Sequence, residues 1–248
     1  MHKLDKSTHF LYNKIMKTEN FYKDNIDLEY RRFHKKICKT KYNILGIKLP
    51  KLRNYAKRLL TIYEIDEIFN SIDNSSYENV LVKGLCIAYS KNLNTLDYLD
   101  RYIPLIDNWA ICDSVVNTLK IFKKNQDKYL SFIEKHLNSN NEFEIRFSLV
   151  ILLNYYINDN YKDYLYNVLD NVNTSYYYTY MAASWLLSYL FIYYYLDTIK
   201  YLQISKLDNK TICKGITKTI ESHRITKNQK DNLKKIRQIL NEKKLKKL

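Results

Sequence analysis

Glycine and proline are scarce in this chain, which has three glycines and two prolines among its 248 residues. Architectures built from strands and tight turns need more of both residues, because glycine adopts positive φ angles and proline fixes turn geometry. Leucine, isoleucine, lysine, asparagine and tyrosine are abundant instead, and short polar stretches separate the apolar segments. The composition therefore predicts an all-α protein whose helices are joined by short loops.

Cysteine is also infrequent, and its four positions are scattered along the chain: Cys38, Cys86, Cys112 and Cys213. No two of them form a C-x-x-C pair, and no histidine lies at metal-ligand spacing from them, so we expect no metal site. Scattered cysteines in a chain of this length are typical of reduced, buried thiols in an intracellular protein. The N-terminal residues MHKLDKSTHF contain no apolar core of a secretory signal, and we expect a cytoplasmic protein.

Acidic residues are too few to balance the basic ones, since 41 lysines and arginines face 26 aspartates and glutamates, a formal net charge of +15. Such a field attracts polyanions, so nucleic acid is the leading partner class and an anionic membrane surface the second. A solvated coat of lysines is the alternative. The segment 171–196 contains no charged residue. It is long enough to span a bilayer, but its many polar residues and tyrosines favour a buried helix instead.

Helical periodicity recurs along almost the whole chain. Many of the predicted helices begin at a polar residue that is suited to an N-cap position: Ser76 with Asn79, Asn94, Asp107, Asn141, Thr174, Asp208 and Thr226. The predicted helices are 3–17, 27–39, a helix that begins near Pro50, 64–71, 76–90, 94–105, 108–123, 125–138, 142–157, 160–172, 175–194, 196–204, 209–222 and 227–246.

The predicted helices form antiparallel pairs of roughly forty residues, which is the period of HEAT and armadillo repeats. Stacked pairs of this kind bury their apolar faces against each other and build a curved, right-handed solenoid with a concave surface. No Gly/Ser-rich linker divides the chain, so we expect one domain over residues 1–248. The basic segment 227–248 is either a terminal helix that caps the solenoid or a mobile tail that contacts phosphates.

Four side chains stand at intervals that match this period. Trp109 and Asp113 in DNWAICDSVV are four residues apart, so they share one helix face. Arg146 lies in the apolar helix EFEIRFSLVILL, and Trp185 lies in MAASWLLSYL. The intervals from 109 to 146 and from 146 to 185 are 37 and 39 residues, close to one repeat each. Because equivalent helices of adjacent repeats face the same groove, the four side chains are expected to line one concave site.

Each of these residues also has an ordinary structural interpretation. A tryptophan on an amphipathic helix is most often part of the core. An aspartate near the start of a helix often serves only the helix dipole. An arginine in an apolar helix often pairs with a nearby acid such as Glu142 or Glu144. The spacing of the four residues as a set is what favours a functional site.

The chain resembles the HEAT-like repeat DNA alkylation repair proteins, which include the AlkD-type alkylpurine DNA glycosylases and their relatives. The resemblance covers about residues 25–225 and rests on ILGIKLPKLRNYAKRL, IDNWAICDSVVNTLK, EFEIRFSLVILLNYYI and YMAASWLLSYLF. It implies that Trp109, Asp113 and Trp185 form a catalytic trio and that Arg146 contacts the DNA backbone. It also implies hydrolysis of the N-glycosidic bond of cationic N3- or N7-alkylpurines in duplex DNA. Nothing in the sequence demands a dimer, so we expect a monomer, located in the cytoplasm at the nucleoid.

The chemistry that the resemblance implies is physically reasonable. An alkylated purine carries a positive charge that weakens its glycosidic bond, and the transition state resembles an oxocarbenium ion. Indole faces stabilise cations, and a partly desolvated carboxylate stabilises the sugar cation and positions a water molecule. No metal or organic cofactor is required. The family acts on the exposed lesion without a deep base pocket, in contrast to most base-excising enzymes.

Two other functions are consistent with the sequence. The same groove would serve a non-catalytic nucleic-acid-binding protein of this family, which holds DNA or structured RNA through its phosphates. A helical-repeat scaffold would instead use the positive charge to bind an acidic protein. The sequence leaves open the function of the 27–45 segment.

Overall fold

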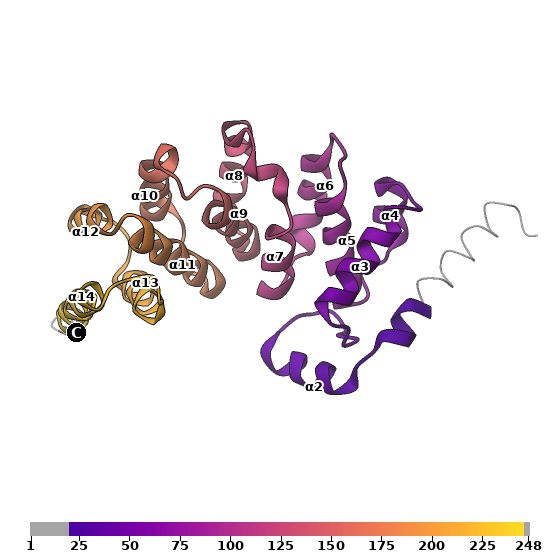
Figure 1. Ribbon diagram of the computed structural model, residues 1–248, viewed down its shortest axis with the longest axis horizontal. Helices are drawn as coiled ribbons and strands as arrows, with labels where there is room; N and C mark the ends of the chain where they lie inside the picture. Colours follow the sequence, from indigo (N-terminus) through magenta and orange to yellow (C-terminus); the bar gives the residue numbers. More distant parts are fainter. Residues whose placement is uncertain (1–19, 246–248) are drawn as a thin grey trace, which may run out of the picture. The chain divides into compact units, whose positions relative to one another are not determined.

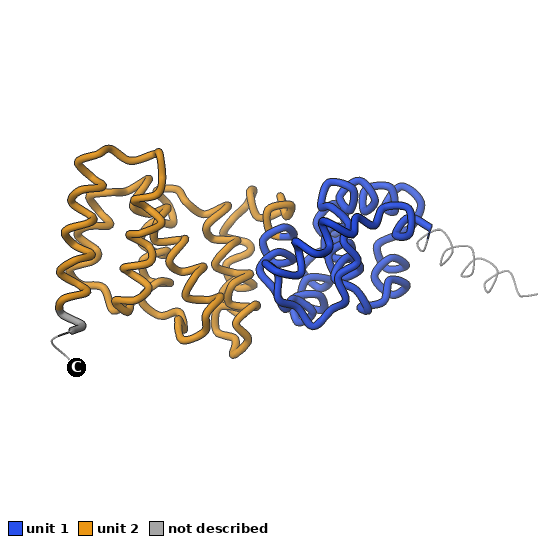
Figure 2. The backbone as a smooth tube through the Cα atoms, turned by 90° about the horizontal axis from the view of Figure 1, so that it is seen from below, with its two compact units in different colours: residues 1–115 blue, residues 116–248 orange. Residues whose placement is uncertain are grey.

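The computed structural model describes the backbone of residues 20–245 and the side chains of residues 20–242. Within that range every regular element is a helix, apart from one isolated bridge between Asn43 and Ser76, so the predicted all-α class is confirmed. The predicted helix 3–17 lies outside the described residues. The chain divides into two compact units, residues 1–115 and 116–248 (Figure 2). A single domain over residues 1–248 stays a prediction.

The first unit is built around α5, whose residues are buried along almost the whole helix and which packs against α3, α4 and α6 (Figure 1). A short helical segment at residues 20–25 precedes the first complete helix. The elements of this unit are α2 (Leu28–Ile37), α3 (Leu49–Leu59), α4 (Ile65–Ser71), α5 (Tyr77–Tyr89), α6 (Thr95–Tyr102), the 3₁₀ turn η1 (Ile103–Leu105) and α7 (Trp109–Val116), which ends at the boundary.

The second unit contains two rows of helices, with α9, α11 and α13 in one row and α8, α10 and α12 in the other (Figure 1). Helix α11 packs against both α9 and α13. The charge-free segment 171–196 contains α11, which buries most of its residues between these helices and exposes one row of them. None of the described helices is long and apolar enough to cross a membrane. The elements are η2 (Lys120–Lys123), η3 (Gln126–Tyr129), α8 (Leu130–Leu137), α9 (Glu142–Tyr155), η4 (Asp159–Tyr161), α10 (Lys162–Asn171), α11 (Tyr177–Tyr193), α12 (Tyr195–Ile204), α13 (Asn209–Glu221) and α14 (Lys227–Leu245).

Four of the predicted N-caps are confirmed. In each case a side-chain oxygen accepts a hydrogen bond from a backbone N–H in the first turn, which satisfies one of the donors that a helix start leaves unpaired. The cap bonds are Asn79 N to Ser76 Oγ (3.1 Å), Phe143 N to Asn141 Oδ1 (2.9 Å), Thr211 N to Asp208 Oδ1 (2.9 Å) and Gln229 N to Thr226 Oγ1 (3.3 Å).

Three predicted caps differ from the prediction. Asn94 occupies the N-cap position of α6, but its side chain makes no cap bond. Tertiary contacts use the other two side chains differently. Asp107 accepts hydrogen bonds from the chain after α2, and the neighbouring Asn108 caps α7 instead. Thr174 Oγ1 donates to Asp208 Oδ2 over 2.7 Å. Helix α11 begins later, and its first turn is capped by an acid from another helix.

Helix α7 is shorter than the sequence predicts, because it ends at Val116 and not near residue 123. The hydroxyl of Tyr155 donates to the Val116 carbonyl over 2.8 Å, and Lys120 Nζ donates to the Asn117 carbonyl over 3.1 Å. These side chains satisfy carbonyls that would otherwise accept from the next helical turn. The chain continues in 3₁₀ geometry at η2.

Gly84 in α5 has no room for a side chain, which makes it a test of how tightly the first unit is packed. A Cβ atom there would overlap the hydroxyl end of the fully buried Tyr102 and lie 2.6 Å from Val115 Cγ2. We expect Gly84→Ala to lower the free energy of unfolding by about 1–3 kcal/mol, because overpacking outweighs the better helix propensity of alanine. Urea denaturation measures this change. A Cβ atom at Gly215 would come no closer than 2.8 Å to another side chain, that of Leu187, so Gly215→Ala is expected to cost less; the opposite order would contradict the packing.

Candidate active site

The accessible side of α7 carries Trp109 and Asp113. Both side chains are partly exposed, whereas Ile111, Cys112, Val115 and Val116 on the other side of the helix are 0% exposed. Residues four apart lie one above the other on a helix, so the indole and the carboxylate share the accessible face. The first unit therefore presents an aromatic ring and an acid together at its surface.

The position of Trp109 is fixed by the chain that follows α2. Its indole Nε1–H donates to the Ile37 carbonyl over 3.4 Å, at the end of α2. Asp107, two residues before the indole, accepts hydrogen bonds from Thr40 Oγ1 (2.8 Å) and the Lys41 backbone N–H (2.6 Å). The sequence did not reveal this contact, because residues near 40 and near 107 are far apart along the chain.

The segment 45–47, part of the motif LGIKLP, is held by a buried acid. The carboxylate of Glu78, 0% exposed at the start of α5, accepts from the backbone N–H groups of Leu45 (2.9 Å), Gly46 (2.7 Å) and Ile47 (3.2 Å). Gly46 has a φ of +96°, and a Cβ atom there would lie 2.7 Å from the Asp27 carbonyl oxygen. Only glycine fits this turn, which packs against the start of α2.

Helix α2 exposes apolar and basic side chains next to Trp109. Its inner side buries His34, whose ring packs edge-to-face on Tyr77 with centroids 4.6 Å apart. Its outer side exposes three large apolar residues and three cations: Leu28, Phe33 and Ile37 with Arg32, Lys35 and Lys36. An exposed face of this composition is typical of an interaction surface. The 27–45 segment therefore contacts Trp109 and exposes these apolar and basic side chains.

Arg146 is almost entirely buried in the second unit, with 6% of its surface exposed. Its guanidinium donates to the Tyr178 carbonyl over 3.1 Å and lies 5.9 Å from the centroid of the Tyr178 ring. Glu142, one turn earlier on α9, accepts from the Tyr178 backbone N–H over 3.0 Å. Together these two α9 side chains hold both polar groups of one backbone residue in the first turn of α11. Glu142 is the cap that sequence reasoning missed, although a polar pair four residues apart in an apolar helix was a visible signal.

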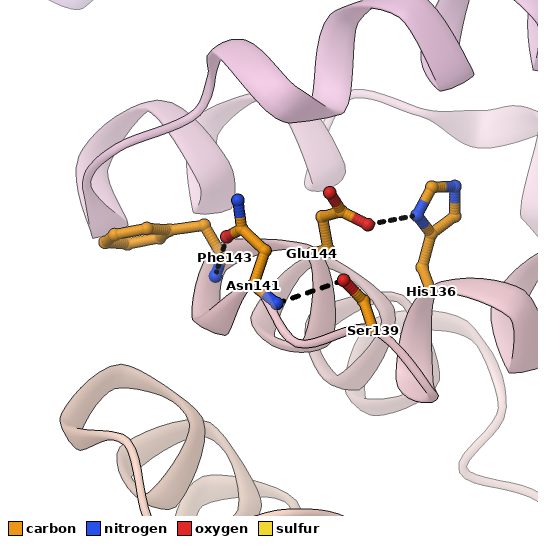
Figure 3. Close-up of polar contacts among 5 residues, drawn as sticks. All are labelled: His136, Ser139, Asn141, Phe143 and Glu144. Carbon is orange, nitrogen blue, oxygen red and sulfur yellow. Dashed lines mark hydrogen bonds and ion pairs between the residues drawn. The ribbon is translucent and has the colours of Figure 1, made fainter.

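The start of α9 is itself held in place by polar contacts with α8 and the intervening loop (Figure 3). His136 Nδ1 and Glu144 Oε2 are 3.2 Å apart, and Ser139 Oγ accepts from the Asn141 backbone N–H over 3.0 Å. Asn141 in turn caps the helix. Glu144, one of the acids named as a possible partner for Arg146, is thus paired with a histidine of α8.

Trp185 lies in the middle of a stripe of partly or fully exposed residues on α11. The stripe has a strict four-residue spacing and consists of Tyr177, Met181, Trp185, Tyr189 and Tyr193, while the residues between them are mostly buried. The Trp185 and Tyr189 rings meet edge-to-face with centroids 6.3 Å apart. We call this set the α11 stripe. It contains no charged residue, so the second unit presents a continuous, largely aromatic surface around Trp185.

Three of the four cysteines are buried, and the described residues provide no cluster of metal ligands. Cys112 is fully buried, although Asp113 beside it reaches the surface. Burial raises the pKa of Cys38 and of Cys86 to about 12, so neither is a thiolate at neutral pH. Cys213 is partly exposed, so the prediction of buried thiols holds for three of the four cysteines. Among residues 20–242 no group of three or more histidine, cysteine or acidic side chains is placed to hold a metal ion.

The predicted site residues thus fall into two groups. Trp109 and Asp113 share the accessible face of α7 in the first unit, and Arg146 and Trp185 lie on the adjacent helices α9 and α11 in the second. Arg146 and Trp185 are linked through Tyr178, which Arg146 binds and which precedes Trp185 by two turns on the same side of α11. The convergence of all four side chains on one site stays a prediction.

Comparison with known proteins gives one match. The model of a family described as DNA alkylation repair enzyme matches residues 19–218, which is most of the chain and covers the helices from α2 to α12. The match ends within α13, so the turn after α13 and the basic helix α14 lie beyond it. No curated protein matches the chain.

Proposed function

The chain belongs to the DNA alkylation repair enzyme family, and we propose that it is a DNA glycosylase that releases cationic N3- and N7-alkylpurines from duplex DNA. A role in DNA repair follows from the family. The observation that carries the glycosylase proposal is the pairing of Trp109 with Asp113 on the accessible face of α7. The net positive charge of the protein attracts DNA, which is a polyanion. The acid and the indole on its surface attract the cationic base within that DNA.

Asp113 is the residue that we expect to act on the reacting atoms. As the glycosidic bond breaks, positive charge moves from the purine to the deoxyribose, and a nearby carboxylate stabilises that charge most in the transition state. The same carboxylate orients the water molecule that attacks the sugar. The proposed hydrolysis needs no metal or organic cofactor, because the alkylated purine leaves as a neutral base.

Trp109 and Trp185 would pack against the sugar and the edge of the lesion. The face of an indole attracts a cation, and its apolar surface excludes water from the carboxylate. In this proposal Arg146 contacts the DNA backbone. Its guanidinium is held in position by the hydrogen bond to the Tyr178 carbonyl. The outer face of α2, with Phe33 between basic side chains, would contact the DNA next to Trp109.

The remaining parts of the proposal concern how DNA is held. We propose that the helix pairs are HEAT-like repeats of one right-handed solenoid, that the protein acts as a monomer, and that its basic side chains bind the phosphates. Affinity for duplex DNA should then fall with salt, because each phosphate contact releases a counterion. A scaffold for an acidic protein would not show this salt-dependent affinity for duplex DNA.

The proposed activity can be measured directly. Purified protein incubated with duplex DNA that contains 7-methylguanine is expected to release the free base faster than the spontaneous reaction, in a single-turnover assay analysed by chromatography. Unmodified guanine in the same duplex is the control and should not be released, because its leaving group is not cationic. A chelator should leave the rate unchanged.

Binding without release would contradict the glycosylase proposal. Salt-sensitive binding to duplex DNA with no released base would identify a non-catalytic nucleic-acid-binding protein of the same family. Failure to bind duplex DNA at low salt would contradict both functions and would favour an acidic protein as the partner.

A further inference from the structure

One exposed arginine of the second unit lies against the α11 stripe. Arg224, in the turn between α13 and α14, is exposed, and its guanidinium carbon is 5.6 Å from the centroid of the Tyr189 ring. Tyr189 follows Trp185 by one helical turn, and the two rings are in edge-to-face contact. The structure therefore places a cation beside the ring that is one helical turn from Trp185, the tryptophan proposed to contact the lesion.

The turn that carries Arg224 is held in place by its neighbours. The Arg224 backbone N–H donates to Ser222 Oγ over 3.2 Å, and the next residue, Ile225, is buried. The guanidinium forms no ion pair with any residue between 20 and 242, and α11 carries no acid that would neutralise it. Arg224 thus combines a contact with the Tyr189 ring with a positive charge that is in no ion pair among the described residues.

The chemistry of this pair matches the sugar-phosphate backbone. A planar guanidinium stacks on an aromatic face and at the same time donates two parallel hydrogen bonds to a phosphate. A tyrosine ring beside it offers an apolar surface of the size of a deoxyribose. A cation–π contact at an exposed site contributes little to the stability of the protein, so it does not by itself require an arginine there.

We infer that Arg224, held over Tyr189, binds a DNA phosphate that flanks the lesion, while the Tyr189 ring packs on the adjoining deoxyribose. This inference rests on the proposed function for the choice of DNA as ligand. It assigns the contact to a residue beyond residues 19–218, the segment that the family model matches. Arg224 adds a cation, from the turn before α14, to the aromatic side chains of the α11 stripe.

The test measures binding to a duplex with a stable abasic-site analogue, by fluorescence anisotropy at several salt concentrations. Arg224→Gln is expected to weaken binding about eightfold at 0.1 M salt and to reduce the slope of log K against log[salt] by about 0.9, the loss of one phosphate contact. Arg224→Lys should keep the slope. Tyr189→Leu should weaken binding with an unchanged slope, because it removes packing and no charge.

Arg101→Gln is the matched control, because Arg101 is also exposed and lies 4.4 Å from the centroid of an aromatic ring, that of Phe69. It is expected to leave both the affinity and the slope unchanged. An unchanged slope in Arg224→Gln would overturn the inference, as would an equal loss in Arg101→Gln.

The proposed function is judged separately, by base release. If the wild-type protein releases 7-methylguanine and Arg224→Gln binds like the wild type, the inference fails and the glycosylase proposal stands. If no base is released but the slope still depends on Arg224, the phosphate contact stands and the glycosylase proposal fails. A wild-type protein that does not bind duplex DNA contradicts both.

Discussion

Replacing Asp113 with asparagine is expected to slow the release of 7-methylguanine by about 10²–10³-fold, the usual effect of removing one electrostatic contact to a transition state. Asparagine has the same shape but no negative charge, so it cannot stabilise the sugar cation. Single-turnover kinetics on N7-methylated duplex measure this loss. The carboxylate is on the accessible face of α7, so the substitution leaves the buried side of the helix intact.

Binding separates this effect from a structural one. The Kd for a duplex with an abasic-site analogue should be unchanged or lower in Asp113→Asn, since a negative charge is removed near the phosphates. Asp97→Asn, an exposed acid in the first turn of α6, serves as the control and should keep the full rate. Undiminished base release by Asp113→Asn would exclude the proposed function of this carboxylate.

Replacing Glu78 with alanine is expected to lower the free energy of unfolding by about 3–5 kcal/mol. The substitution leaves the N–H groups of the segment 45–47 without an acceptor, and each unpaired buried donor costs about 1–3 kcal/mol. It also frees the turn at Gly46 that holds the start of α2. Urea denaturation followed by circular dichroism measures the loss of stability.

Loosening the start of α2 in Glu78→Ala should also change the surroundings of Trp109, because the indole is hydrogen-bonded to the end of this helix. Its fluorescence maximum is expected to move to longer wavelength in Glu78→Ala, recorded in a Trp185→Phe background in which Trp109 is the only tryptophan. Glu29→Ala, which removes an exposed acid from α2, is the control and should change stability by less than about 0.5 kcal/mol. A cost below about 1 kcal/mol for Glu78→Ala would show that the turn does not depend on this acid.

Local patterns predicted most of the helices. Periodic apolar residues locate α3, α5, α9, α11 and α13, and caps such as Ser76 and Asp208 act within their own first turn. Where a predicted helix end is wrong, a residue far away in the sequence forms a hydrogen bond with the backbone at that end. Thr174 does not cap α11, because Glu142 of α9 takes the free N–H group in that helix's first turn. Helix α7 ends early, because Tyr155 takes the carbonyl at its end.

The sequence by itself determined the all-α class, the strong positive charge and the placing of Trp109 and Asp113 on one helix face, because periodicity and spacing are local properties. The tertiary structure alone decided which residues hold the segments next to Trp109 in the first unit and the start of α11 in the second. Glu78, Asp107, Glu142 and Arg146 each bind backbone groups more than thirty residues away or on another helix. Such partners satisfy buried polar groups only once the helices have packed, and no local pattern encodes that pairing.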